Sequence, residues 1–248
     1  MNLGSRERMA VLLARELRDG WTVGTGVRSL VPAAACLLAQ ATHAPDLTVL
    51  AGGIYTNPRR LVALATGLDC RPEATGDFVD VYQTTERGID AIFHSGLQID
   101  RFGNVNLHWV DRPQGRLRGP GVANTSFGHT AGRILLWLER HDPRVLVEHV
   151  DFVSIAGLRI RKRTRAELGM PNLGPAVLVT PSVLFAPDGG ELLARSTHGT
   201  RDWAAVRRDT GWPLPDQPPP CTPEPTPEEI SVLRSVVDPG GLLREAAS

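Results

Sequence analysis

Residues 21–53 carry the pattern that most restricts the fold of this chain. The segment WTVGTG (21–26) predicts a short strand that ends in glycines, and LVPAAACLLAQA (30–41) predicts a helix of small apolar residues. LTVL (47–50) predicts a second strand, which is followed by Ala51-Gly52-Gly53. A strand, a glycine turn, a helix and a further strand form a βαβ unit, whose two strands lie parallel. The pattern therefore predicts an α/β fold.

Other elements are expected on both sides of this unit. A helix is expected over residues 5–19, with Ser5 as N-cap and Gly20 as stop. The segment GRILLWLER (132–140) fits a buried strand or a helix equally well by periodicity. The remaining expected elements are strands at Ile89–His94, Val150–Ile155 and Ala176–Leu184, and a helix over 229–237 with Thr226 as a possible N-cap.

The composition limits the partners and the location of the protein. Its 248 residues include 27 Lys and Arg against 27 Asp and Glu, so the formal net charge is zero. Nucleic acid or an anionic membrane would require a basic field, so neither is expected as a partner. No apolar segment is long enough to span a membrane, and the charged N-terminal segment is unlike a signal peptide. These features predict a cytoplasmic protein.

The chain is long enough for one large domain with a C-terminal arm. We expect an α/β domain over residues 1–214, followed by a proline-rich connector and a C-terminal helix over 215–248. The segment WPLPDQPPPCTPEPTP (212–227) has the composition of an extended connector. The three cysteines, Cys36, Cys70 and Cys221, are widely spaced, so neither a disulfide framework nor a metal site is expected.

Gly24 and Gly26 could form a phosphate-binding loop at the start of a helix. The dinucleotide pattern G-x-G-x-x-G is incomplete because position 29 is Ser29. No acidic residue follows the second strand, where such proteins bind a ribose. A tight turn without a ligand is the favoured interpretation, and a dinucleotide enzyme is not expected.

Two later segments combine glycines with small polar residues. HSGLQIDRFGNVN (94–106) predicts a hairpin turning at Arg101–Asn104, and the same residues could frame a ligand site. RGPGVANTSFGHTAG (118–132) is either a surface loop or an anion-binding loop of backbone N–H groups. Together with the glycines above, the candidate ligand-binding residues are Gly24, Gly26, Gly52, Gly53, Ser95, Gly96, Gln98, Asn104, Asn106, Gly119, Gly121 and Asn124.

Several segments, in order and spacing, resemble one family. LQIDRFGNVN (97–106), GPGVAN (119–124) and VDFVSIAG (150–157) are similar to motifs of the β subunit of family I coenzyme A transferases, most closely the glutaconate CoA-transferase type. LGMPNLGPAVLVT (168–180), VRRDTGWPL (206–214) and DPGGLL (238–243) extend the resemblance over nearly the whole chain.

The resemblance implies an open CoA-transferase fold of the ribose-phosphate isomerase-like kind. Such a fold has a mostly parallel sheet with glycine-rich loops at its strand ends. It also implies a homologous α subunit as partner, in an α2β2 assembly, and an acyl-CoA substrate. CoA would then be part of the substrate, and no tightly bound cofactor is expected.

The resembling transferases carry a glutamate nucleophile within the stretch ESG, and the matching residues here are Ala51-Gly52-Gly53. Alanine cannot attack a thioester. A branch of the superfamily, the ring-cleaving hydrolases of steroid degradation, also lacks this glutamate and uses one from its α subunit. No catalytic residue is therefore assigned to this chain, and Tyr55 either donates a hydrogen bond in the pocket or has a packing role.

Three functions remain open at this point. The chain is a subunit of a CoA-ester hydrolase or C–C-cleaving enzyme, a subunit of a true CoA transferase with its nucleophile at another position such as Glu73 or Glu86, or a non-catalytic subunit that completes the α subunit's site.

Overall fold

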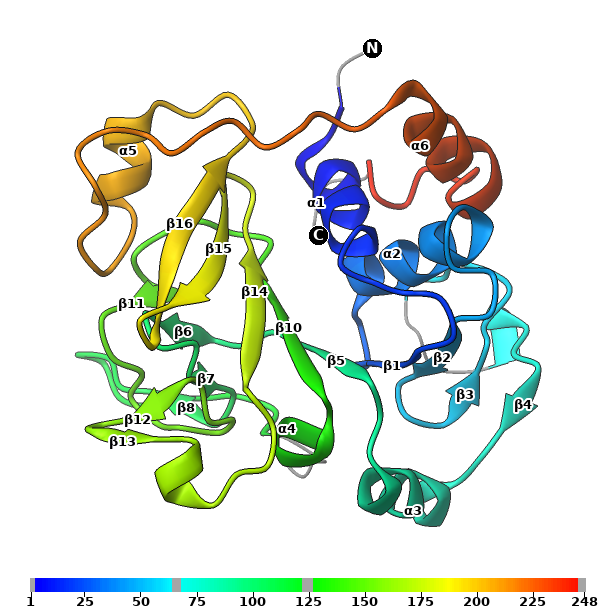
Figure 1. The fold of residues 1–248 in the computed structure, drawn as a ribbon, viewed down its shortest axis with the longest axis horizontal. Helices are drawn as coiled ribbons and strands as arrows, with labels where there is room; N and C mark the ends of the chain where they lie inside the picture. The colour runs from blue at the N-terminus through cyan, green and yellow to red at the C-terminus, as the bar shows by residue number, and fades with distance from the viewer. Residues whose placement is uncertain (1–2, 64–67, 122–126, 245–248) are drawn as a thin grey trace. The chain divides into compact units, whose positions relative to one another are not determined.

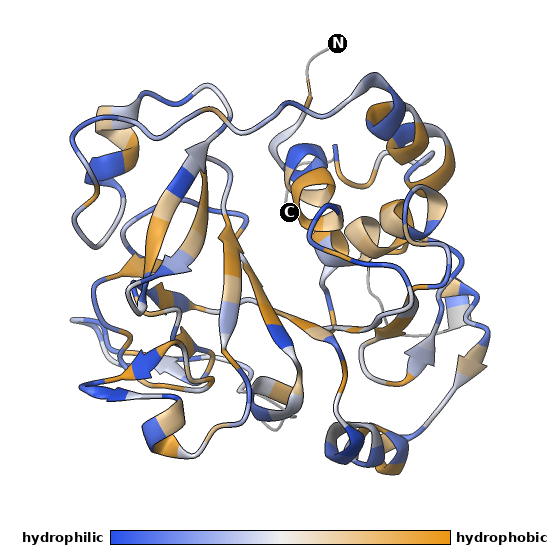
Figure 2. Cartoon of the chain, in the orientation of Figure 1, coloured by the Kyte–Doolittle hydropathy of each residue, from blue (hydrophilic) through white to orange (hydrophobic). Residues whose placement is uncertain are grey.

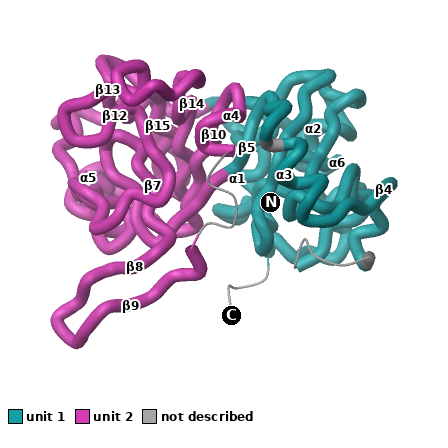
Figure 3. The backbone as a smooth tube through the Cα atoms, turned by 90° about the horizontal axis from the view of Figure 1, so that it is seen from below, with its two compact units in different colours: residues 1–93, 223–248 teal, residues 94–222 magenta. Residues whose placement is uncertain are grey.

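The computed structural model describes residues 3–63, 68–121 and 127–244 (Figure 1). The predicted ligand residue Asn124 lies outside these residues. The chain divides into two compact units, Met1–Phe93 with Pro223–Ser248 and His94–Thr222, which Figure 3 colours separately. The domain boundary expected between residues 214 and 215 falls inside the second unit, and that division remains a prediction.

The first unit contains the expected βαβ pattern. Strand β1 (Thr22–Thr25) leads into helix α2 (Leu30–Ala41) and then into β2 (Thr48–Ala51). The two strands pair in parallel, with Thr22 opposite Thr48 and Thr25 opposite Ala51. Helix α2 buries its small apolar residues, which lets it pack closely. The α/β fold that the sequence predicted is confirmed.

Three further strands complete this part of the sheet. Strand β5 (Ala91–His94) lies on one side of β1 and is parallel to it. On the other side, β2 is followed by β3 (Tyr55–Thr56) and then by β4 (Ala74–Thr75). Each of these two strands is antiparallel to the strand before it. The sheet order is β5-β1-β2-β3-β4. The remaining elements of the unit are α1 (Ser5–Ala14), η1 (Leu68–Cys70), α3 (Phe78–Arg87), α6 (Pro227–Val232) and a π-helical turn at Leu233–Val237.

The first and last helices of the chain are joined by ion pairs in this unit. Arg15 binds Glu229 through two nitrogens, at 2.8 and 2.7 Å. Glu7 is 1% exposed and accepts from Arg234 at 2.7 and 2.9 Å. Burial alone would raise the pKa of Glu7, but the hydrogen bonds from Arg234 and from the Gly4 N–H lower it.

The helix ends agree only in part with the sequence prediction. Thr226 caps α6, because its hydroxyl accepts from the Glu229 N–H at 3.1 Å, as expected. The first helix ends at Ala14 rather than at residue 19, because the following turns tighten to i→i+3 hydrogen bonds at Glu16 and Leu17. Gly4, not Ser5, is its N-cap.

The second unit is built on strands β10 (Arg133–Trp137), β14 (Pro175–Val179), β15 (Val183–Asp188) and β16 (Glu191–Thr197). β10 and β14 are parallel, and β14, β15 and β16 form an antiparallel meander. Hydrophobic residues run along β10 and β14 (Figure 2), and Ile134, Leu135 and Leu178 are fully buried. The ambiguous segment GRILLWLER therefore contains a strand, and the burial of this strand explains its continuous apolar run.

Smaller elements accompany this sheet. β11 (Leu146–Val147), β6 (Gln98–Asp100) and β7 (Val105–Asn106) form a three-stranded sheet in that order. Two further hairpins are β8 (Trp109–Val110) with β9 (Leu117–Arg118) and β12 (Arg159–Ile160) with β13 (Arg163–Thr164). The unit also holds α4 (Phe127–Thr130), η2 (Ala166–Leu168) and α5 (Trp203–Arg208).

Two strand predictions in this unit are corrected by the structure. The segment Ala176–Leu184 is not one strand, because the Thr180 hydroxyl accepts from the N–H groups of Ser182 and Val183 and turns the chain. The segment Val150–Ile155 is not a strand, and only Ile155 forms an isolated bridge, to Val105. In the described part of the chain, no helix has the length and apolar character needed to cross a membrane.

Candidate functional site

The ends of β1 and β2 place Ala51 between two hydroxyl-bearing residues. Thr25 pairs with Ala51, Ala51 pairs with Tyr55, and Tyr55 pairs with Thr75. Paired residues of neighbouring strands, about 4.8 Å apart, point to the same face of a sheet. The side chains of Thr25 and Tyr55 therefore flank the methyl group of Ala51.

We call the paired residues Thr25, Ala51 and Tyr55 the Ala51 row. The hydroxyl group of Thr25 is unusual in this row. Thr25 is 3% exposed and Ala51 is 1% exposed. Among the described residues, Thr25 Oγ1 has no hydrogen-bond partner. A buried hydroxyl without a partner costs about 1–3 kcal/mol, and such groups often bind a ligand or an ordered water. Sequence reasoning did not single out Thr25, because only the strand register shows that it lies beside Ala51.

Different structural requirements explain the four glycines at positions 24, 26, 52 and 53. Gly52 and Gly53 have φ values of 60° and 80°, which favour glycine and turn the chain from β2 into β3. The Gly52 N–H donates to Thr25 O at 2.9 Å, which links the ends of the two parallel strands. A Cβ atom at Gly24 would lie 2.4 Å from Ile92 Cδ1, and one at Gly26 would lie 3.0 Å from Ser29 Oγ. Packing thus accounts for Gly24 and a tight turn for Gly26, while their role in ligand binding stays a prediction.

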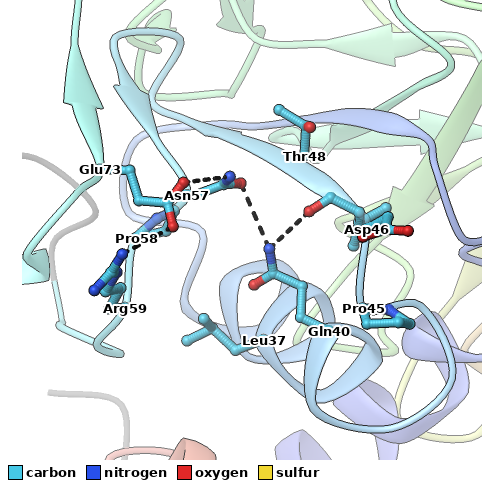
Figure 4. Close-up of a pocket in the computed structure, with 10 residues that line it drawn as sticks. Leu37, Gln40, Pro45, Asp46, Thr48, Asn57, Pro58, Arg59 and Glu73 are labelled. Carbon is cyan, nitrogen blue, oxygen red and sulfur yellow. Dashed lines mark hydrogen bonds and ion pairs between the residues drawn. The ribbon is translucent and has the colours of Figure 1, made fainter.

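The alternative nucleophiles Glu73 and Glu86 do not belong to the paired residues Thr25, Ala51 and Tyr55. Glu73 lines a polar pocket at the amino end of β2, where it accepts from Asn57 Nδ2 at 2.9 Å and from Arg59 at 3.1 Å (Figure 4). Hydrogen bonds from Asn57 and then Arg59 lower the pKa of Glu73. Glu86 is exposed on α3. Neither carboxylate extends from the strand end that holds Ala51.

The hairpin of β6 and β7 is confirmed, and its amides bind other parts of the same chain. Asn106 Nδ2 donates to Gln98 Oε1 at 2.7 Å and to Trp109 O at 2.6 Å. Gln98 Oε1 also accepts from the Asp151 N–H at 3.0 Å. Gln98 and Asn106 are buried, so these polar groups stabilise the hairpin from within.

Asn104 has the same role at the turn. Its Nδ2 donates to Asp100 Oδ2 and to Arg159 O, each at 3.0 Å, and its Oδ1 accepts from the Gly157 N–H at 2.8 Å. Burial raises the pKa of Asp100 although four hydrogen bonds oppose the shift. The turn is thereby joined to the segment around Gly157, which lies 53 residues further along the chain.

Gly96, Gly119 and Gly121 gather around the end of β7. A Cβ atom at Gly96 would lie 2.7 Å from Asn106 O, and one at Gly119 would lie 2.3 Å from Leu107 O. The Gly121 N–H donates to Leu107 O at 2.9 Å. The structure therefore brings these three predicted residues together with Gln98 and Asn106, and close backbone approach explains the glycines at positions 96 and 119.

A groove of about 760 Å³ opens beside this hairpin, entirely within the second unit. Three predicted ligand residues, Ser95, Gly96 and Gln98, line it. One wall is the β8–β9 hairpin, which projects from the rest of the unit (Figure 3), and another is the segment after β10. We call this cavity the unit 2 groove. The other lining residues include Val110, Asp111, Arg112, Leu117, Trp137, Leu138, Glu139, Arg140, Asp142, Arg144 and Val147.

Two histidines of the second unit are held neutral. Burial lowers the pKa of His94 to about 4, and its Nε2 atom has no hydrogen-bond partner among the described residues. Burial and the Arg201 charge lower the pKa of His141 to about 4. The ring nitrogens of His141 lie 2.9 Å from Thr180 Oγ1 and 2.9 Å from Thr210 Oγ1. Neither histidine carries a charge near neutral pH.

The chain is similar to subunits of several known enzymes. No family model matches the chain. It is 28% identical over 223 residues to the B subunit of 3-oxoadipate CoA-transferase of Pseudomonas knackmussii, covering 85% of this chain and 84% of the relative. It is 25% identical over 258 residues to the B subunit of glutaconate CoA-transferase of Acidaminococcus fermentans, covering 96% and 94%. It is 26% identical over 241 residues to the IpdB subunit of the cholesterol ring-cleaving hydrolase of Mycobacterium tuberculosis, covering 95% of both.

Solved structures show the same fold. The decarboxylase AibA/AibB matches with a TM-score of 0.82 at 24% identity, over 98% of both chains. Glutaconate CoA-transferase of Acidaminococcus fermentans matches with a TM-score of 0.82 at 20% identity, over 99% of both chains. The chain is thus a homologue of the B subunits of CoA transferases, with the fold of these subunits. More particularly, its homologues include the IpdB subunit of a ring-cleaving hydrolase.

Proposed function

We propose that this chain is the β subunit of a heteromeric enzyme that hydrolyses a CoA thioester or cleaves a carbon–carbon bond or ring in its acyl part. The catalytic residue comes from a homologous α subunit, in an α2β2 assembly. The single observation that carries the proposal is the row of Thr25, Ala51 and Tyr55, with a methyl group where the resembling transferases keep a glutamate.

The absence of a carboxylate at Ala51 argues against covalent transfer on this chain. Transfer of CoA between acids requires a group that holds the acyl unit while the two acids exchange. A methyl group cannot do so, and Glu73 is bound by Asn57 and Arg59 near the other end of β2. The relatives named as a hydrolase and a decarboxylase support a reaction without transfer.

In this proposal the two flanking residues bind the reacting oxygen. The unpaired Thr25 hydroxyl can donate to a water molecule or to the thioester oxygen, and the Tyr55 phenol can donate from the opposite side. A hydroxyl donor aimed at an oxygen that gains charge lowers the barrier of acyl chemistry. Both residues are candidates for direct contact with the substrate.

Mass spectrometry of the complex tests the proposal. The chain is co-purified with its partner, incubated with 3-oxoadipyl-CoA, glutaconyl-CoA and a steroid-derived CoA thioester, and reduced with borohydride. Release of free CoA or of a cleaved acyl product, without a reduced glutamyl residue on this chain, is expected. A glutamyl adduct on Glu73, Glu86 or any residue of this chain would instead establish a transferase.

Ala51→Glu is the matched variant for this experiment. The new carboxylate stands where the resembling transferases have theirs, so a thioester adduct at position 51 is expected in the variant alone. Because Ala51 is buried, the pKa of the new carboxylate will be raised and the adduct yield will increase with pH. If α alone catalyses the reaction at the rate of the complex, the β chain is a structural subunit and the proposal fails.

A further inference from the structure

Helix α3 lies beside the strand end that holds Ala51. Strand β4 runs parallel to β2, because each of them is antiparallel to β3, so α3 leaves the sheet at the edge where β2 ends. The two elements are in contact there, since a Cβ atom at Gly53 would lie 3.2 Å from Val81 Cγ2. In Figure 1, α3 lies apart from α1, α2 and α6, which gather on the other side of the strands. The helix is therefore a neighbour of the Ala51 row.

One face of α3 is apolar and uncovered. Val81 packs against the turn after β2, whereas Phe78 is 72% exposed and Tyr82 is 54% exposed. Residues four apart share a helix face, so Phe78, Tyr82 and Glu86 form a stripe. Val79, which is 60% exposed, borders it. We call these four exposed residues the α3 stripe. Its two rings alone expose on the order of 250 Å² of largely apolar surface.

A further exposed apolar residue lies at the same edge of the sheet. Val27 is 57% exposed and follows Thr25, the last residue of β1. Because β1 and β2 are parallel, Val27 and the α3 stripe both lie at the edge where these strands end. Exposed apolar patches of a few hundred Å² mark interaction sites on soluble proteins. The Ala51 row thus ends at an edge whose surface is suited to a partner.

The charge and the length of the α3 stripe select its occupant. Glu86 makes no ion pair with any residue in the described part of the chain. A second copy of this chain would bury two Glu86 carboxylates between apolar faces without a cation, which is costly. The stripe extends about 12 Å from Phe78 to Glu86, so a small acyl group would cover only part of it. A different protein chain, with an apolar surface and a basic residue, fits both properties.

We propose that the α3 stripe is a docking surface for the α subunit, and that a lysine or arginine of that subunit binds Glu86. The assignment rests on the proposed function, in which the α subunit brings its catalytic residue to the Ala51 row. Stable interfaces bury about 800 Å² on each partner, so the stripe is the centre of a larger contact. Aromatic residues at such a centre carry much of the affinity.

Photo-crosslinking in the complete complex identifies what covers the stripe. Phe78 is replaced by p-benzoylphenylalanine, and Leu193, an exposed residue of β16 in the other unit, is the control position. A crosslink from position 78 to the α subunit is expected, with little or none from position 193. A crosslink from position 78 to a second copy of this chain or to added glutaconyl-CoA would overturn the inference. So would the absence of any crosslink, or equal crosslinking from both positions.

Biolayer interferometry with the purified α subunit measures the energetic weight of the stripe. Tyr82→Ala is expected to weaken binding about thirtyfold. Glu86→Gln should weaken it about tenfold and reduce its dependence on salt, because one charge pair is lost. Leu193→Ala should stay within about twofold of the wild type, and all three variants should keep its Tm, because the replaced side chains are exposed. Equal affinity in all four chains would contradict the assignment.

These measurements do not require turnover, so the two proposals can fail separately. If the α subunit binds the stripe but the complex transfers CoA through a glutamyl adduct, the proposed function fails alone. If the complex cleaves a CoA thioester while position 78 does not contact the α subunit, the docking surface is wrong and the proposed function stands.

Discussion

Replacing Asn104 with alanine tests whether the amides of the β6–β7 turn hold the fold rather than a ligand. The change deletes the acceptor of the buried Gly157 N–H and a donor to the buried carboxylate of Asp100. An unpaired buried N–H costs about 1–3 kcal/mol, and a lost hydrogen bond to a charged group costs about 1.5–3 kcal/mol. The free energy of unfolding should therefore fall by about 4 kcal/mol, and Tm by about 10 °C.

Urea unfolding followed by circular dichroism measures this change. Gln114→Ala is the control, because it removes an amide that is exposed on the β8–β9 hairpin and should alter stability by less than about 0.5 kcal/mol. A loss of less than about 1 kcal/mol in Asn104→Ala would refute the reasoning. If stability is unchanged and binding of an acyl-CoA is lost, Asn104 belongs to a ligand site, as its residue type first indicated.

Two further predictions concern buried groups of the second unit. The pKa of His141 is about 4 in the folded chain and about 6.5 in the unfolded chain, so its protonation favours unfolding. The free energy of unfolding should keep its full value above pH 6.5 and fall by about 3 kcal/mol as the pH drops to 4. His141→Gln should remove this part of the pH dependence, measured by urea unfolding at each pH. In Gly157→Ala the new Cβ would lie 2.1 Å from Phe102 O, so loss of the cooperative melt is expected, whereas Gly240→Ala, with nothing within 4 Å, should melt like the wild type.

The sequence was most informative where local chemistry decides structure. Two glycines and a helix of small residues were enough to predict the βαβ unit, because each signal lies within a few residues of the element that it ends or begins. The same holds for the β6–β7 hairpin, whose turn residues Arg101–Asn104 were identified directly. Thr226 was recognised as a cap because its partner Glu229 is three residues away.

Long-range pairing explains what the sequence did not reveal. The segment Val150–Ile155 is rich in β-branched and aromatic residues, as strands are. Ser154, however, accepts from the Leu107 N–H and Asp151 accepts from Gln98 Nε2, so its polar side chains bind the hairpin. Amides such as Asn104 were expected to bind a ligand, and that role stays a prediction, because the structure shows them bound to the same chain. Their partners, however, lie about fifty residues away, and no local pattern distinguishes such a partner from a ligand.

The discontinuous first unit has a consequence for the order in which the chain can fold during synthesis. Its sheet is complete by Phe93, but Glu7 and Arg15 receive their partners Arg234 and Glu229 only when the end of the chain emerges. Ribosomes add about 5–20 residues per second, so the buried Glu7 carboxylate must wait on the order of ten seconds for its arginine. The segment His94–Thr222 is contiguous and has no such delay. In the cell the middle of this protein is therefore expected to fold before its beginning.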